Sequence, residues 1–343
     1  MDDDALSTPL RADLVLEGGG VKGLGLVGAV DALAATGYTF PRVAGTSAGA
    51  VVGAFVAALQ HAGEPLTRLA DVARSVDYRR LRDRGPLGRF AGPLRPVVDG
   101  LSLAFESGVF EGEYLRDWLV GALADLGVRT FADLRTPPDA ANLPEHRYSL
   151  VVTASDLSRQ RLVRLPWDYP LYGLDPDEQL VADAVRTSAS IPFYYEPVTL
   201  RSPERSVSTL VDGGVLSNYP IALFDRTDGR PPRWPTFGVR LSARPDGRTM
   251  TQAVTGPVSL ALALVETLLG AVDAQHIADP CVQARSVFVD TSGISPVDFS
   301  LGKEQQDALL AAGRLAAAGF LDDWSWKRYL RTCRDFEGRE AAG

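Results

Sequence analysis

Short apolar runs alternate with longer apolar segments over the first two thirds of the chain. The runs at residues 12–17 (ADLVLE), 38–44 (YTFPRVA) and 206–211 (SVSTLV) have the length and residue types of strands. The segments at 24–35 and 48–59 are long enough for buried helices, and each follows a predicted strand after a short glycine-containing stretch. This alternation predicts an α/β fold with a central, mostly parallel sheet flanked by helices.

Three short stretches next to these elements combine glycines with polar residues. They are Gly18-Gly19-Gly20-Val21-Lys22-Gly23, Gly45-Thr46-Ser47-Ala48-Gly49 and Asp212-Gly213-Gly214. The middle stretch has the G-x-S-x-G pattern of a nucleophile elbow, in which a serine is exposed on a sharp turn between a strand and a helix. A serine nucleophile needs a base that takes its proton and donors that hold the oxyanion it creates. The other two stretches offer groups of both kinds.

The scarcity of histidine narrows the choice of base. The chain holds three histidines, His61, His146 and His276, and none is near these stretches in the sequence. A carboxylate is therefore favoured, and Asp212 is the candidate. An aspartate in water has a pKa of about 3.9, so partial burial must raise the pKa of Asp212 if it is to act as a base.

The first stretch also resembles the loops that bind nucleotides. Its glycines fit G-x-G-x-x-G, but the acidic residue that this fingerprint expects about 20 positions later is missing, because no Asp or Glu lies between Asp31 and Glu64. A P-loop requires Ser or Thr after Lys22, where this chain has Gly23. The stretch retains a row of backbone N–H groups at a helix N-terminus, which suits an oxyanion as well as a phosphate.

In their order and spacing, the three stretches resemble the patatin-like phospholipase family, which are serine acyl hydrolases with a Ser–Asp dyad. The resemblance covers about the first 225 residues and implies that Ser47 is the nucleophile and Asp212 the general base. The segment at 189–193 (ASIPF) is similar to the A-S-x-x-x-P-type segment that precedes the family's aspartate. The resemblance also implies an oxyanion hole from Gly18, Gly19 and Gly20 with Lys22 nearby, and supporting glycines at Gly45, Gly49, Gly213 and Gly214.

One residue departs from the family's pattern. Glu17 precedes the glycine run where the family often has Asp. We expect this change to matter little, because backbone N–H groups hold the oxyanion.

For the whole chain, the resemblance implies a patatin-like variant of the three-layer α/β-hydrolase architecture. We expect a catalytic domain over residues 11–240 and a mostly helical C-terminal part, 241–343, packed on the same domain. The implied function is a lipid acyl hydrolase of the phospholipase A or lysophospholipase type, which cleaves carboxylic ester bonds through an acyl-enzyme intermediate. This chemistry needs no metal and no cofactor.

Two other functions remain open. His276 follows Asp212 in the chain, so a Ser47–Asp212–His276 triad would have the Ser…Asp…His order of an α/β-hydrolase esterase. Alternatively, the loop at Gly18–Gly23 belongs to a non-catalytic module that binds a nucleotide.

Charge and apolar segments limit the partners. A net charge of −8 argues against nucleic acid and against electrostatic docking on anionic lipid. Contact with a membrane would then be apolar, through the insert at 79–110, which is also a candidate lid, or through the tail at 320–329 with its two tryptophans. Packing against the protein's own core is the alternative for both. The apolar stretch at 258–272 contains Glu266 and is too short to span a bilayer, so we expect a core helix there.

Composition also bears on the compartment. The chain has 343 residues, of which 45% are hydrophobic, enough for a core without disulfides. Cys281 and Cys333 lie far apart without metal-binding spacing, and so small a number of cysteines fits a reducing compartment. Residues 1–10 are acidic and lack the pattern of a signal peptide. We therefore expect a cytoplasmic protein, with peripheral membrane contact at most.

Overall fold

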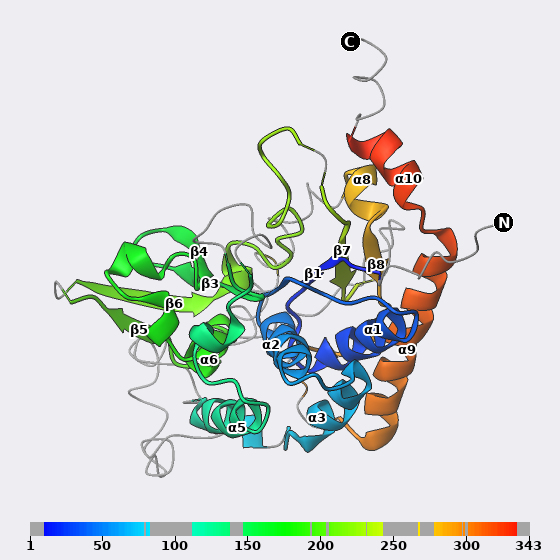
Figure 1. Ribbon diagram of the computed structural model, residues 1–343. Helices are drawn as coiled ribbons and strands as arrows, with labels where there is room; N and C mark the ends of the chain where they lie inside the picture. The colour runs from blue at the N-terminus through cyan, green and yellow to red at the C-terminus, as the bar shows by residue number, and fades with distance from the viewer. Residues whose placement is uncertain are drawn as a thin grey trace.

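The sheet and the helices that cover it appear in a computed structural model. The structure describes residues 10–78, 80–82, 112–137, 147–192, 194–203, 206–230, 232–242, 267, 278–296, 298 and 301–334. Within these residues eight strands form one mixed sheet, against which helices pack (Figure 1). The strand order is β5-β6-β3-β2-β1-β7-β8, and β4 pairs with β3 outside this path. The predicted α/β fold, a mostly parallel sheet flanked by helices, is confirmed.

Strands at the centre of the sheet are parallel, and antiparallel pairing is confined to one side. The strands are β1 (Asp13–Leu16), β2 (Val43–Gly45), β3 (Leu150–Asp156), β4 (Arg161–Leu165), β5 (Val198–Arg201), β6 (Val207–Asp212), β7 (Thr236–Arg240) and β8 (Ser286–Phe288). The pairs β1–β2, β1–β7, β2–β3 and β7–β8 are parallel, while β3–β4, β3–β6 and β5–β6 are antiparallel. Every residue of β1, β2 and β3 is buried, as the continuous apolar runs of parallel strands require.

The second predicted strand begins later than its sequence indicated. The apolar run starts at residue 38, whereas β2 starts at Val43. Pro41 has no backbone N–H to donate to a neighbouring strand, so regular pairing begins only after it.

The register of the sheet brings two distant residues to the same level. Gly45 of β2 pairs with Val152 of β3, and Asp212 at the end of β6 pairs with Ala154 of the same strand. Ser47 follows Gly45 by two residues, just as Ala154 follows Val152. Ser47 and Asp212 therefore flank β3 from its two sides at one level of the sheet.

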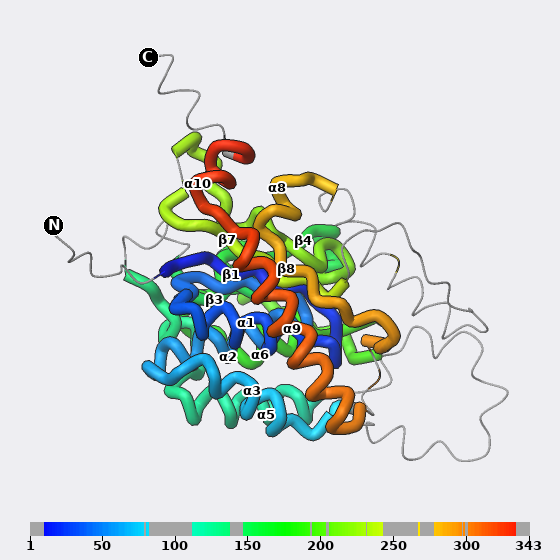
Figure 2. Tube along the Cα trace, turned by 90° about the vertical axis from the view of Figure 1, so that its right-hand side faces the viewer, coloured from blue at the N-terminus to red at the C-terminus, as the bar shows by residue number. Residues whose placement is uncertain are grey.

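Helices α1 and α2 follow β1 and β2 as predicted. The α-helices are α1 (Gly23–Ala35), α2 (Ala48–His61), α3 (Leu69–Ser75), α5 (Glu113–Ala124), α6 (Val181–Ser188), α8 (Pro280–Gln283), α9 (Lys303–Asp323) and α10 (Trp326–Tyr329). Single helical turns are η1 (Gly20–Lys22), η2 (Leu66–Arg68), η3 (Arg80–Arg82), η4 (Phe131–Leu134), η6 (Tyr169–Tyr172), η7 (Pro176–Glu178), η8 (Gly213–Val215) and η9 (Leu330–Arg334). Figures 1 and 2 show α3 and α5 at the opposite end of the molecule from α8 and α10.

Helix α9 lies directly against α1, as both views show (Figures 1 and 2). Glycines make this contact close: a Cβ on Gly28 would collide with the carbonyl oxygen of Leu310, and one on Gly313 with that of Gly25. Both α9 and β8 come after residue 240, so the domain boundary that the sequence suggested falls between two paired strands of one sheet. The helix predicted at 258–272 lies outside the described residues apart from Thr267.

Aromatic side chains of the tail at 320–329 pack on the protein itself. Trp324 lies edge-on to Phe237 of β7, with ring centroids 4.9 Å apart, and stacks on Phe320. Phe320 and Tyr329 are both buried. Of the two alternatives for this segment, packing against the core is therefore what the structure shows. Among the described residues, no helix combines the length and the apolar character needed to cross a membrane.

The two cysteines form a disulfide. Cys281 of α8 bonds to Cys333 of η9, across a sequence separation of 52 residues. The chain runs through α9 between the two cysteines and ends close to α8, and this proximity cannot be predicted from the spacing of the cysteines in the sequence. Because these cysteines are paired, they no longer support a reducing compartment, and the cytoplasmic location stays a prediction.

Candidate active site

Ser47 occupies a strained turn between β2 and α2. Its backbone has φ 53° and ψ −120°, a conformation rarely adopted by a residue with a Cβ. The two glycines of the motif allow the turn: a Cβ on Gly45 would collide with the carbonyl of Gly49, and one on Gly49 with that of Leu16. The predicted strand–turn–helix elbow is therefore present, and the strain in it is typical of a functional residue.

Residue Thr46, just before the nucleophile candidate, is held from two sides. Its Oγ1 lies 2.6 Å from Thr153 Oγ1 and donates to the carbonyl of Ser217 at 3.3 Å. Gly213 packs against Thr153, because a Cβ on Gly213 would lie 2.5 Å from the carbonyl oxygen of Thr153. These contacts connect the elbow to the segment that follows Asp212.

Asp212 is buried at the end of β6, with 2% of its surface exposed. Its Oδ1 accepts a 2.8 Å hydrogen bond from the N–H of Gly214, and its Oδ2 has no close hydrogen-bond partner among the described residues. Burial raises the pKa of Asp212 to about 7, against the opposing effects of the Ser47 hydroxyl and the Gly214 N–H. A carboxyl with this pKa can accept or release a proton near neutral pH.

Helix α6 positions both residues from its C-terminal end. The N–H of Ser47 donates to Ser188 Oγ at 2.9 Å, and the N–H of Asp212 donates to the carbonyl of Ser190 at 2.9 Å. Sequence reasoning did not find Ser188, because a serine at the end of a helix has no distinctive local signal. Its contact comes from a segment 141 residues away from Ser47.

Replacing Ser188 by alanine is expected to destabilise the fold by about 1–3 kcal/mol, because the buried N–H of Ser47 loses its acceptor. Urea denaturation of Ser188→Ala measures the loss. Ser202→Ala, in the turn between β5 and β6, is the control and should leave the free energy of unfolding nearly unchanged. An unchanged value in Ser188→Ala would mean that another group takes over as acceptor.

The glycine loop after β1 lies beside the elbow, and a Cβ on Gly18 would be 3.1 Å from the Cβ of Ser47. Gly18 and Asn218 exchange two hydrogen bonds of 3.1 Å: the N–H of Gly18 donates to the Asn218 carbonyl, and Asn218 Nδ2 donates to the Gly18 carbonyl. The N–H of Gly18 is therefore occupied. The N–H groups of Gly19 and Gly20 have no hydrogen-bond acceptor within the described residues. Lys22 lies in η1, where its N–H donates to the Gly19 carbonyl.

Glu17 has a larger role than its sequence position suggested. Its Oε1 accepts hydrogen bonds from Arg240 Nε and Nη2 at 3.0 and 2.8 Å, and its Oε2 accepts from the N–H of Leu241. The side chain of Leu241 in turn covers Gly19, where a Cβ would lie 2.5 Å from Leu241 Cδ1. The carboxylate of Glu17 thus joins the end of β7 to the glycine loop, and the expectation that Glu in place of Asp matters little stays a prediction.

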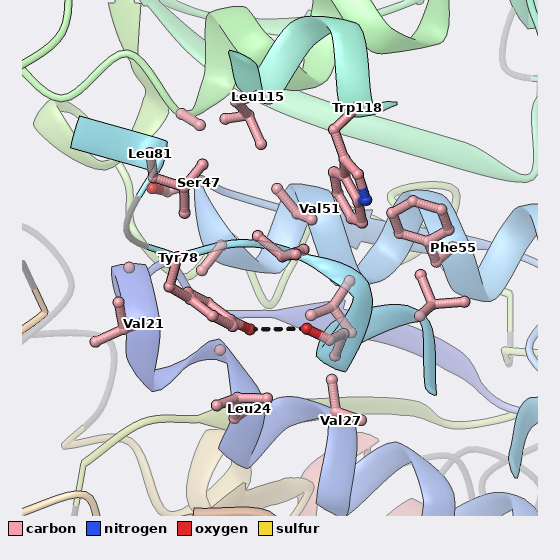
Figure 3. A pocket seen from close by; sticks show the side chains of 18 of the residues that line it. Val21, Leu24, Val27, Ser47, Val51, Phe55, Tyr78, Leu81, Leu115 and Trp118 are labelled. Atoms are coloured by element: carbon pink, nitrogen blue, oxygen red, sulfur yellow. Dashed lines mark hydrogen bonds between the residues drawn. The ribbon is translucent and has the colours of Figure 1, made fainter. Parts of the chain in front are cut away.

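An apolar cavity of about 110 Å³ opens beside Ser47 (Figure 3). Most of its wall comes from the four helices α1, α2, α3 and α5, and apolar side chains make up nearly all of its lining. Representative lining residues are Leu24 and Val27 of α1, Val51 and Phe55 of α2, Val72 of α3, and Leu115 and Trp118 of α5. Leu81 of η3 also contributes, and it belongs to the insert at 79–110, of which the structure describes residues 80–82.

The histidines stay apart from this site as far as they are described. His61 is the last residue of α2, and Ser47 lies just before its first, so the helix separates them by about 20 Å. His146 and His276 lie outside the described residues, as does Phe193 of the segment at 189–193. In the part of the chain that the structure describes, no group of three or more His, Cys, Asp or Glu side chains is arranged to hold a metal ion.

Comparison with known proteins gives matches over most of the chain. Residues 14–225 match the family model described as patatin-like phospholipase. The uncharacterized protein YqhO of Bacillus subtilis is 35% identical over 314 residues, which are 92% of this chain and 99% of that protein. An uncharacterized NTE family protein of Mycobacterium tuberculosis, Rv2565, is 26% identical over 323 residues. That match covers 90% of this chain but 46% of the relative, so the chain spans about half of its length.

A solved structure also has the same fold. The crystal structure of VipD from Legionella pneumophila aligns with a TM-score of 0.50 and 17% sequence identity. The alignment covers 92% of this chain and 67% of that chain.

Proposed function

Because the chain belongs to the patatin-like phospholipase family, we propose that it is a serine acyl-ester hydrolase with Ser47 as nucleophile and Asp212 as general base. Membership of the family supports a lipid hydrolase in general terms. Beyond this general activity, we propose the dyad and a reaction of the phospholipase A or lysophospholipase type. One observation carries it: beside the hydroxyl of Ser47 lies a buried carboxyl whose pKa is raised to about 7.

In the first half of the reaction, Oδ2 of Asp212 takes the hydroxyl proton of Ser47 while Oγ attacks the carbonyl carbon of the ester. The electron pair of the C=O bond moves onto its oxygen. The N–H groups of Gly19 and Gly20 are free to hold this oxyanion, and each well-placed donor contributes roughly 3–4 kcal/mol. Gly18 instead supports the loop through Asn218.

Collapse of the tetrahedral intermediate breaks the bond to the alcohol. The alcohol oxygen takes the proton from Asp212, and the acyl group stays on Ser47. Water then attacks the acyl-enzyme, and Asp212 takes one of its protons. The bond between the carbonyl carbon and Oγ breaks, Ser47 recovers its proton from Asp212, and the carboxylic acid leaves.

The surroundings of the glycine loop favour this reaction over nucleotide binding. Gly20 and Gly23 border the cavity beside Ser47, and the lining there is apolar. A nucleotide phosphate requires charged or polar groups around it, whereas a lipid acyl chain requires the apolar side chains that this cavity offers. Contact with a lipid surface through the insert at 79–110 stays a prediction, since most of that insert lies outside the described residues.

A fluorophosphonate probe and a panel of phospholipids and lysophospholipids test the proposal. We expect the probe to label the peptide that contains Ser47 in the folded protein and not in the heat-denatured protein. We expect mass spectrometry to detect fatty acids released from at least one lipid of the panel. Labelling elsewhere, or no release from any lipid or short-chain ester, would overturn the assignment.

A further inference from the structure

The cavity beside Ser47 follows one face of α2. Ser47, Ala48, Val51, Val52 and Phe55 all line it, with the spacing of side chains on a single helical face. Figure 3 shows Ser47 at one end of the lining and Phe55 with Trp118 at the other. Eight residues of helix separate Ser47 from Phe55, so the cavity extends for about 12 Å along the helix.

Beyond Ser47, the walls offer a ligand almost only carbon. The polar tips of three aromatic residues in the lining are all bonded within the protein. Tyr78 donates to the carbonyl of Ala73 at 3.2 Å, Tyr195 to that of Leu81 at 2.8 Å, and Trp118 Nε1 to Ser75 Oγ at 3.3 Å. A ligand in this cavity therefore gains from burying apolar surface, and beyond Ser47 the described lining residues offer it no free side-chain donor.

The far end of the cavity is formed by two aromatic rings. The rings of Phe55 and Trp118 have centroids 5.1 Å apart, and Phe55 is almost fully buried. Phe55 projects from α2 and Trp118 from α5, so their contact joins the two helices across the end of the cavity (Figure 3). A ligand that enters beside Ser47 meets these rings after about 12 Å.

We propose that this cavity binds one straight acyl chain of about ten carbons and that Trp118 with Phe55 sets this limit. The estimate follows from an extended chain, which advances about 1.2 Å per bond and so fills 12 Å with about ten bonds. The lining side chains of α2 follow a single face of that helix, so we place one chain in the cavity and leave the second chain of a diacyl lipid outside it. This inference rests on the proposed function, because the chain is counted from an ester carbon placed at Ser47.

Binding of fatty acids to the full-length Ser47→Ala protein tests the limit without requiring hydrolysis. Straight-chain carboxylates from hexanoate to hexadecanoate, each kept below its micelle concentration, are titrated by calorimetry. We expect the affinity to rise about fourfold with each added CH₂ as far as decanoate and to level off beyond it. A rise that continues to hexadecanoate, or no dependence on chain length, would overturn the proposal.

Two further variants in the same background move the limit in opposite directions. Trp118→Ala should extend the rise beyond decanoate and bind tetradecanoate roughly tenfold or more tightly than the parent does. Val51→Phe fills the cavity one helical turn from Ser47, about 6 Å along it, so hexanoate should still bind while decanoate loses its advantage. Val120→Ala is the control, because this side chain of α5 is exposed outside the cavity. If both variants keep the parent's dependence of affinity on chain length, Trp118 does not set the limit and the chain does not lie along α2.

The outcomes separate this proposal from the proposed function. If decanoate marks the limit of binding but no lipid is hydrolysed, the chain-length assignment stands and the esterase assignment falls. If esters of all chain lengths are hydrolysed equally well, the esterase assignment stands and the limit falls.

Discussion

Replacing Ser47 by alanine is expected to lower the rate of ester hydrolysis by a factor on the order of 10⁴ or more, because the reaction loses its nucleophile. The fold should be retained. Alanine keeps the Cβ, so the turn at φ 53° is neither relieved nor made worse, and the N–H of residue 47 still donates to Ser188. The loss then reports chemistry and not unfolding.

Hydrolysis of a short-chain nitrophenyl ester measures this loss, and circular dichroism checks the fold. Ser202→Ala, in the turn between β5 and β6, is the matched serine control and should keep the parent's rate. Retention of the parent's rate in Ser47→Ala would remove Ser47 from the mechanism. In that case the strained turn would need another explanation.

The sequence predicted the elbow at Ser47 because an elbow depends on local geometry, while the role of Asp212 stays a prediction. An elbow requires glycines at fixed positions around its serine, and Gly45 and Gly49 each lie where a Cβ would meet backbone. The helices after β1 and β2 could also be predicted from the sequence, because each corresponds to a long apolar segment. Structural features that depend on residues close together in the chain can be predicted from a single sequence.

Contacts between distant segments left no such pattern. Ser188 and Asn218 are common residue types whose partners lie 141 and 200 residues away. The disulfide forms because the path of the chain through α9 brings Cys333 close to Cys281. Glu17 forms its ion pair with Arg240 of β7, 223 residues away. The cavity could not be predicted from the sequence either, because its lining comes from several separate segments whose apolar residues resemble those of any other core.

Asp212→Asn is expected to be inactive and yet more stable than the parent protein above neutral pH. Asparagine cannot take the proton of Ser47, so hydrolysis fails. Its side-chain oxygen still accepts from Gly214, so the local structure is kept. The gain in stability comes from removing a carboxylate that is ionised in a buried position.

The direction of this pH dependence of stability follows from the protonation of Asp212 in the folded and the unfolded protein. Burial raises the pKa of Asp212 in the folded protein to about 7, against 3.8 as its reference value. Between these two values the folded state keeps the proton and the unfolded state has released it, so stability falls as pH rises through this window. Above about pH 7 the full cost applies, which for about three pKa units is about 4 kcal/mol. The activity of the parent should rise over the same range, as the base becomes ionised.

Urea denaturation of Asp212→Asn and the parent at several pH values tests this opposition. The variant should unfold at the higher urea concentration at about pH 8, by up to about 4 kcal/mol, and the difference should disappear towards about pH 4. Asp228→Asn is the control with the opposite sign, since Arg226 holds the pKa of the exposed Asp228 carboxyl below its usual range. If Asp212→Asn is less stable than the parent at about pH 8, the carboxylate is held by groups that favour its charge, and a proton transfer near neutral pH loses its basis.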